Sequence, residues 1–363
     1  MSRPLGLGIA GAGRFGAFSL AAYAELADVH PVAVADEDVA RAAAMAPLGA
    51  AVYGDLRALL DDARVEIVAI TTPPLAHGGM AAEAARAGKH VFVEKPLATS
   101  LRDARAAVEA ARRAGVRLGI DYVLRHHPLH RLALRLVRAG ILGKLLHWSL
   151  ENYASLDPIP GGHWFWDRRR SGGIHVEHGV HFFDLCNQAA GDPPDGVAGG
   201  FQHGPDGRTD RAWAHVTYGS RLAATFYHAF VRTDATEQTT IRLGFERGEA
   251  ILEGWIPVRL VVRLEDGDPS TGDALRELFG TVERRRGAQV AEAVAPDRQG
   301  EYRRAIQSGM RDLVAAVREE RDPEVTPDDA LQSLEIALRA SPEDGPAADR
   351  PPARSSSSAR SPA

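Results

Sequence analysis

Residues 5–16, LGLGIAGAGRFG, decide which fold the sequence predicts. An apolar run of strand length ends there in a G-x-G-x-x-G turn, and a helix-like segment follows at residues 17–27. In such a turn the first glycine permits a tight bend, the second lets a pyrophosphate approach the backbone, and the third lets the helix pack against the strand. The negative charge of the pyrophosphate then lies next to the unpaired N–H groups at the helix N-terminus. A glycine-rich turn without a ligand is the alternative interpretation. We expect the turn to bind a dinucleotide through Gly11, Ala12, Gly13, Arg14, Phe15 and Gly16.

A carboxylate strengthens this prediction. A second apolar run, residues 32–35, ends in Asp36, 20 residues after Gly16. A carboxylate at that position can accept hydrogen bonds from ribose hydroxyls and repels a 2′-phosphate, which favours NAD(H) over NADP(H). NADP(H) becomes the better ligand if the nearby Arg41 turns inward to meet a 2′-phosphate.

The bulk composition narrows the class of protein. A chain of 363 residues, 45% hydrophobic and 25% charged, suits two globular domains. Its formal net charge of −5 favours neither nucleic acid nor an anionic membrane as a partner. The single cysteine, Cys186, excludes an intramolecular disulfide and fits a reducing compartment. Since we find neither an export signal nor an apolar run of the roughly 20 residues that span a bilayer, the expected location is the cytoplasm.

Strand–helix units continue to about residue 122 and predict a parallel sheet with helices on both faces. Thr72-Pro73 and Glu94-Lys95-Pro96 each follow a strand, at the edge where open α/β sheets bind ligands. Further along, residues 196–263 are predicted to form strands of a sheet with one covered face, and residues 265–273 a surface loop. The predicted units are residues 1–122, residues 123–341 and a disordered tail at 342–363.

Lys95 is the first candidate catalytic residue. A lysine held at the cofactor edge can hydrogen-bond a substrate hydroxyl, and its charge favours an alkoxide-like transition state. Without the glycine-rich turn, a surface lysine in a tight loop would be the preferred interpretation.

A second candidate centre lies in residues 171–185, SGGIHVEHGVHFFDL. If this segment is a helix, Glu177 and His181 are i,i+4 neighbours, and the carboxylate can orient the imidazole as an acid–base group. The order His-x-Glu-His-x-x-His matches neither HExxH nor HxxEH, so no metal site is predicted. A packing or surface role is expected for His175, His178, His126, His127 and His130, and a structural acceptor role for Asp184.

Together these residues resemble the Gfo/Idh/MocA family of nicotinamide-dependent oxidoreductases. The matches run in the family's order: Gly11 to Gly16, Thr72-Pro73 with His77, Gly88-Lys89-His90-Val91, Glu94-Lys95-Pro96, Arg125 with Pro128, Gly140 with Gly143-Lys144, and Gly179-Val180-His181 with Asp184. The resemblance implies a Rossmann domain followed by an α+β domain with a large, mostly antiparallel sheet, one face of which often forms a dimer interface.

The resemblance also implies roles for individual residues. Lys95 and His181 would be the catalytic pair, and the acid four residues before the histidine would bind substrate and assist proton relay. That acid is usually aspartate, whereas this chain has Glu177, one methylene longer. The implied cofactor neighbours are Thr72, Pro73, His77 and Glu94. From their flanking positions, Arg125, Trp164 and Trp166 are expected to line the substrate pocket.

The predicted function is hydride transfer between NAD(H) and a secondary alcohol or ketone of a sugar, sugar derivative or cyclitol. His181 would exchange the hydroxyl proton while Lys95 polarises the oxygen. Two alternatives stay open: an NAD-dependent glycosidase that uses transient oxidation, and a non-catalytic NAD(H)-binding sensor or scaffold. A homodimer or homotetramer is expected.

Overall fold

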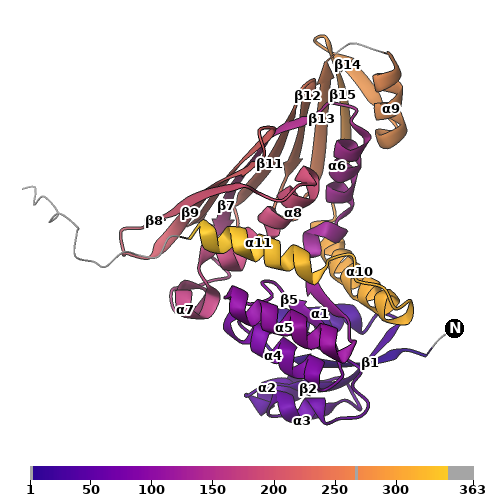
Figure 1. Cartoon of the computed structure of the whole chain (residues 1–363), viewed down its shortest axis with the longest axis vertical. Helices are drawn as coiled ribbons and strands as arrows, with labels where there is room; N and C mark the ends of the chain where they lie inside the picture. Colours follow the sequence, from indigo (N-terminus) through magenta and orange to yellow (C-terminus); the bar gives the residue numbers. More distant parts are fainter. Residues whose placement is uncertain (1–2, 266–268, 342–363) are drawn as a thin grey trace, which may run out of the picture.

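The computed structural model describes residues 3–265 and 269–341. Its N-terminal part is a parallel sheet of six strands in the order β3-β2-β1-β4-β5-β6, with helices on both faces (Figure 1). The strands are β1 (Leu5–Ala10), β2 (Val29–Ala35), β3 (Ala51–Tyr53), β4 (Ile67–Ile70), β5 (His90–Glu94) and β6 (Leu118–Asp121). The helices are α1 (Arg14–Tyr23), α2 (Val39–Met45), α3 (Leu56–Leu60), α4 (Pro74–Arg86) and α5 (Leu101–Ala114). This confirms the predicted doubly wound α/β architecture.

The strand order reverses between β1 and β4, and the turns that follow these strands meet at the carboxyl edge of the sheet. Helix boundaries follow local capping chemistry. Ser100 caps α5 by accepting a hydrogen bond from the Asp103 N–H, and Gly115 ends the helix with φ of 66°.

The second part is a nine-stranded sheet in the order β14-β15-β13-β12-β11-β7-β10-β9-β8. All neighbouring strands are antiparallel except β7 and β10, which run parallel. The strands are β7 (Leu145–Ser155), β8 (Gly196–His203), β9 (Thr209–Tyr218), β10 (Leu222–Arg232), β11 (Gln238–Phe245), β12 (Gly248–Glu253), β13 (Arg259–Glu265), β14 (Val282–Arg285) and β15 (Ala288–Val294). The predicted mostly antiparallel sheet is confirmed.

The remaining helical elements connect the two sheets or cover the second one. They are η1 (Val123–His126), α6 (Pro128–Ala139), η2 (Trp164–Trp166), α7 (Arg168–Ser171), η3 (His175–Gly179), α8 (Val180–Ala190), α9 (Pro269–Phe279), α10 (Arg298–Arg318) and α11 (Pro327–Arg339). On β10 the side chains of Leu222, Ala224, Phe226 and His228 are buried while alternate neighbours are more exposed. One face of the sheet is therefore covered, as the alternation predicts.

The two C-terminal helices return to the N-terminal sheet, and Figure 1 shows α11 lying across the junction between the sheets. The Gln307 amide of α10 donates to the Ala22 carbonyl of α1 over 2.9 Å, and Tyr122 and Ser333 of α11 share a hydrogen bond of 2.6 Å. Buried apolar side chains of both parts form one continuous core. The edge of the parallel sheet is thus held against the second sheet by helices that are distant in sequence.

Two local predictions need correction. Residues 269–273 form the start of helix α9 and not a loop. The helix packs on β15, a strand that was not predicted individually from the sequence. The segment 171–185 is not one α-helix but α7, a π-helical turn η3, and α8. Residues 266–268 of the predicted loop and the predicted disordered tail at 342–363 lie outside the described residues.

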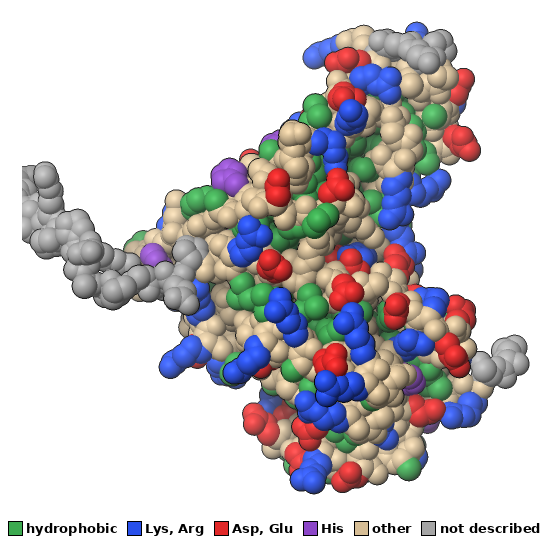
Figure 2. Space-filling view, in the orientation of Figure 1, with side chains coloured by type: hydrophobic (Ala, Val, Ile, Leu, Met, Phe, Trp, Pro, Cys, Tyr) green, Lys and Arg blue, Asp and Glu red, His purple; other side chains and the backbone are tan. Residues whose placement is uncertain are grey.

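Acidic and basic side chains are interspersed over the face shown in Figure 2, as the nearly balanced 43 basic and 48 acidic residues lead one to expect. Within residues 3–265 and 269–341, every helix is too short or too polar to cross a bilayer.

Candidate active site

The glycine-rich turn forms an open cradle between β1 and α1. Gly11 has φ of +108°, and a Cβ there would lie 2.8 Å from the Thr71 carbonyl carbon. A Cβ on Gly16 would lie 2.1 Å from the Gly11 oxygen, so only glycine lets α1 pack this closely. A Cβ on Gly13, the N-cap of α1, would meet no described atom within 4 Å. The empty space at Gly13, in front of unpaired helix N–H groups, fits a bound pyrophosphate.

Asp36 lies directly after β2, beside this cradle. Its carboxylate accepts hydrogen bonds from the Ala12 N–H over 2.6 Å and from the Asp38 N–H over 2.9 Å. The Arg41 guanidinium is 3.3 Å from the same carboxylate. The turn therefore presents both a ribose acceptor and a cation, the two groups whose balance decides between NAD and NADP.

His77 ties together the two turns that were expected to contact a cofactor. Its Nδ1 lies 2.7 Å from the Pro96 carbonyl oxygen and its Nε2 lies 2.6 Å from the Thr72 carbonyl oxygen. The ring is buried, and this burial lowers the pKa of His77. His77 thus positions Thr72-Pro73 and Lys95-Pro96 relative to each other.

Lys95 is held at the end of β5 by Glu177. Its Nζ donates to the Glu177 side chain and to the Glu177 carbonyl oxygen, each over 2.8 Å. Burial alone would lower the pKa of Lys95, but the Glu177 and Glu94 carboxylates outweigh burial and raise it. An ammonium has three N–H donors, and two of them donate to Glu177 here.

His181 lies at the start of α8, facing the end of β5. Its ring is 5.9 Å from the Tyr122 ring and 5.0 Å from the Trp255 ring, and its Nδ1 is buried without a hydrogen-bond partner among the described residues. Burial, with the charge of Lys95, lowers the pKa of His181 well below its ordinary value. The imidazole is neutral at pH 7 and can accept a proton.

The expected orientation of His181 by Glu177 is wrong. The intervening turn η3 is a π-helix, and the Glu177 carboxylate turns to Lys95 rather than to His181. A buried ammonium is a stronger partner for a carboxylate than a neutral imidazole. Glu177 therefore pairs with Lys95.

Arg125 also lies elsewhere than expected. Its guanidinium makes a bidentate, buried ion pair with Asp184, with distances of 2.7 and 2.5 Å, and a further contact of 3.1 Å with Asp329. Asp184 is thus the structural acceptor that was predicted. The prediction that Arg125 lines a substrate pocket does not fit this placement, because its side chain is only 4% exposed. Arg125 instead fastens η1 to α8 and α11.

The two tryptophans of η2 lie in a small second apolar cluster. The indole N–H of Trp166 donates to the Ile159 carbonyl over 3.0 Å, and the Arg208 guanidinium lies 4.6 Å from the Trp166 ring centre. Trp164 lies beside His163, whose pKa is lowered by burial against the opposing effect of the Glu177 charge. Trp166 packs on the protein itself.

His178 packs, as one of its two expected roles, and it also belongs to a polar chain with Asn152 and Thr239. Its Nε2 donates to the Asn152 side-chain oxygen Oδ1 over 3.0 Å, and the Asn152 Nδ2 donates to the Thr239 hydroxyl over 2.8 Å. Its ring lies 5.1 Å from both Trp255 and Phe230. By contrast, His175, His126, His127 and His130 are buried, as a packing role predicts.

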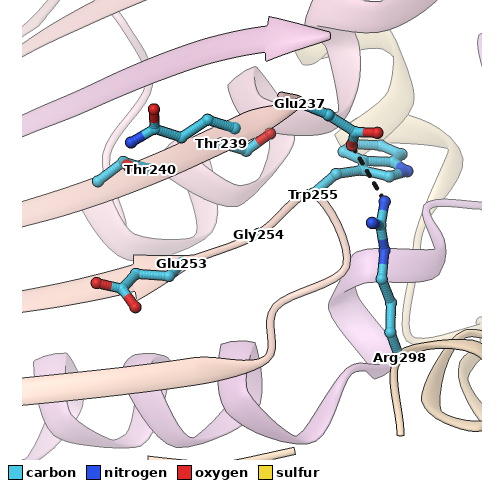
Figure 3. A pocket seen from close by; sticks show the side chains of 8 residues that line it. Glu237, Thr239, Thr240, Glu253, Gly254, Trp255 and Arg298 are labelled. Atoms are coloured by element: carbon cyan, nitrogen blue, oxygen red, sulfur yellow. Dashed lines mark hydrogen bonds and ion pairs between the residues drawn. The ribbon is translucent and has the colours of Figure 1, made fainter. Parts of the chain in front are cut away.

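A pocket of about 370 Å³ opens beside Thr239, the last residue of this hydrogen-bonded series (Figure 3). Thr239 and Trp255 line it, and the Glu237–Arg298 ion pair of 3.1 Å crosses one side. Trp255, which sequence reasoning missed, contacts both this pocket and the His181 ring. No motif marks it, because its place depends on the return of the chain after β12.

Among residues 3–265 and 269–341, no group of three or more His, Cys, Asp or Glu side chains is arranged to hold a metal ion.

Two models of one family match the chain. One, described as "Oxidoreductase family, NAD-binding Rossmann fold", matches residues 5–122, and the other, the "GFO/IDH/MocA C-terminal domain", matches residues 130–251. Together the two models match more than half of the chain. The chain belongs to the Gfo/Idh/MocA oxidoreductase family, which confirms the resemblance noted in the sequence.

Relatives within the family are sugar and cyclitol enzymes. The chain is 26% identical over 291 residues to scyllo-inositol 2-dehydrogenase (NAD(+)) of Bacillus subtilis (strain 168), a match that covers 78% of this chain and 76% of that protein. It is 34% identical over 178 residues to 1,5-anhydro-D-fructose reductase of Ensifer adhaerens, covering 47% of this chain and 53% of that protein. The chain thus spans about half the length of this second relative.

A solved structure agrees over nearly the whole chain. The oxidoreductase domain protein from Kribbella flavida superimposes with a TM-score of 0.78 at 24% identity, covering 93% of this chain and 96% of that one. At this identity the likeness concerns the fold.

Proposed function

We propose that the protein is an NAD(H)-dependent oxidoreductase that transfers a hydride between nicotinamide and a secondary alcohol or ketone of a sugar, sugar derivative or cyclitol. One observation carries the proposal. The Lys95 ammonium is buried beside Glu177 at the carboxyl edge of a dinucleotide-binding sheet, and burial together with its charge lowers the pKa of the His181 imidazole. The names of the inositol and anhydrofructose relatives support the substrate class.

The cradle at Gly13 and the Asp36 carboxylate would hold the dinucleotide, which when bound supplies the hydride acceptor or donor. In the direction of alcohol oxidation, the remaining N–H of Lys95 donates a hydrogen bond to the substrate oxygen and stabilises its developing negative charge. His181 accepts the hydroxyl proton, as its neutral state allows. In the reverse direction the protonated His181 returns that proton.

Glu177 keeps Lys95 charged and fixed in position. Because the carboxylate and the carbonyl oxygen of the same residue both accept from Nζ, the ammonium is restrained in direction as well as in place. Orientation of this kind supplies part of the rate of a hydride transfer.

For the cofactor we propose NAD(H). Asp36 accepts two backbone hydrogen bonds beside the cradle and would repel a 2′-phosphate, whereas Arg41 is half-exposed and already paired with Asp36 and Asp38. Fluorescence titration of the protein with NADH and NADPH tests this. Tighter binding of NADPH, or equal binding of both, would contradict it.

The activity is tested by screening inositols, sugars and keto-sugars for absorbance change at the nicotinamide band. Turnover on one polyol class supports the proposal and names the substrate. Glycoside cleavage without net NADH production would instead favour a glycosidase that uses transient oxidation, and binding without any turnover would favour a sensor.

A further inference from the structure

Two carboxyl side chains lie together beneath the proposed nicotinamide end of the site. Glu94 ends β5, Asp121 ends β6, and the two residues are direct neighbours in the parallel register. Two residues earlier, Phe92 and Gly119 are also register neighbours, and both face α10. Because side chains alternate along a strand, Glu94 and Asp121 point to this same face.

Most of the carboxyl oxygens of this pair lack a hydrogen-bond partner in the described part of the chain. Asp121 is 2% exposed, and both of its oxygens, like Oε2 of Glu94, lack a hydrogen-bond partner among the described residues. The cation beside them, Lys95, gives its hydrogen bonds to Glu177.

The groups that face the pair from the elements packed around it are Tyr23 of α1, Tyr302 of α10, Lys95 after β5 and Glu177 of η3. Both tyrosines are neutral, since burial raises the pKa of each well above its ordinary value. Three carboxyl groups therefore surround a single ammonium. Buried charges without partners are costly, so the pair needs either a proton or a further cation.

We propose that Glu94 and Asp121 favour the oxidised, cationic nicotinamide ring over the neutral reduced ring, and that the pair releases a proton when NAD+ binds. The inference rests on the proposed function, which puts a nicotinamide at this edge of the sheet. In the free protein one carboxyl group of the pair is protonated. When the positively charged ring binds, the ionised carboxylate becomes more stable than the protonated carboxyl group. The proton then leaves to bulk solvent, and no other bond changes.

The proton affinity of the pair suits this role. Burial raises the pKa of Asp121 to about 7, against the opposing charge of Lys95, and burial also raises the pKa of Glu94. A group of this kind is partly protonated at neutral pH, so binding of a cation can change its occupancy. At an effective dielectric constant of about 20, one negative charge more or fewer near a bound cation changes its affinity by about tenfold.

The test measures dissociation constants for NAD+ and NADH on the full chain, with proton release from calorimetry in buffers of different ionisation enthalpy. Asp121→Asn keeps the shape of the side chain, removes no hydrogen bond and cannot ionise. We expect it to lower the preference for NAD+ over NADH by about tenfold and to abolish the proton released with NAD+ near pH 7. Glu94→Gln should act in the same direction.

Asp61→Asn is the matched control. Asp61 is exposed and lies between α3 and β4, at the opposite edge of the sheet, so the same loss of charge there should leave the ratio unchanged.

Equal changes in both dissociation constants would show a merely structural role for Asp121 and overturn the inference. So would equal proton release with NAD+ and NADH in the wild type, a measurement that needs no variant to fold. Failure of the wild type to bind either cofactor is a different result, which would overturn the proposed function as well.

Discussion

The ion pair between Lys95 and Glu177 should be strongly coupled, and a double-mutant cycle can measure it. The two groups are 2.8 Å apart and their side chains are 12% and 13% exposed. Coulomb's law at this distance gives an attraction of about 6 kcal/mol at an effective dielectric constant of about 20. Desolvation cancels part of this, so we expect a coupling free energy of about 3 kcal/mol.

The cycle compares the wild type, Lys95→Met, Glu177→Gln and the double variant by urea unfolding at pH 7. Glu177→Gln should destabilise the fold, because it removes the carboxylate to which the buried ammonium donates a hydrogen bond. The double variant should be more stable than the sum of the single effects predicts. A surface pair, Arg113 and Glu109, provides the control: its side chains are 78% and 53% exposed, and its coupling should stay below about 0.5 kcal/mol.

The pH dependence of this coupling has a definite sign. The folded-state pKa of Glu177 is lowered from 4.5, so its contribution is present above pH 4.5 and is lost as pH falls. The folded-state pKa of Lys95 is raised from 10.5, so its contribution is present below pH 10.5 and is lost as pH rises further. The coupling should therefore be constant between these limits. A coupling as weak as that of the surface pair at pH 7 would refute the reasoning.

Three further predictions concern the proposed chemistry and the frame that holds it. His181→Ala should reduce kcat strongly with the dissociation constant for NADH nearly unchanged, since the ring exchanges a proton; loss of NADH affinity with normal turnover would contradict this. Gly13→Ala should unfold at the wild-type temperature, because the added Cβ meets no described atom within 4 Å. The same change should weaken NADH binding at least tenfold, and an unchanged affinity would show that the pyrophosphate does not bind at this turn. Arg125→Met should lower the free energy of unfolding by about 3–5 kcal/mol because it leaves the Asp184 charge buried, and a thermal midpoint equal to that of the wild type would show that the buried pair contributes little.

Much of the N-terminal fold could be predicted because its signals are local. Strand β1, the glycine turn and α1 are encoded within a few consecutive residues, and the later strands are short, mostly apolar runs. Helix α11 likewise begins with a capping box at Thr326 and Asp329, which its sequence predicts. Prediction failed at α9, where apolar residues are few and their burial depends on β15, a distant partner.

The features of the candidate site likewise fall into those that local sequence predicts and those that only the folded chain brings together. The sequence by itself determined a dinucleotide fold and a lysine at the end of β5, because each follows from periodicity and short motifs. It also singled out His181, but within one helix over residues 171–185, whereas the structure begins α8 at Val180. Only the tertiary structure decided that Glu177 meets Lys95 across 82 residues, that Arg125 pairs with Asp184, and that Glu94 and Asp121 share one buried space. These contacts depend on strand register and on helices that return from the far end of the chain, and burial fixes which charges must be paired. No local pattern carries that information.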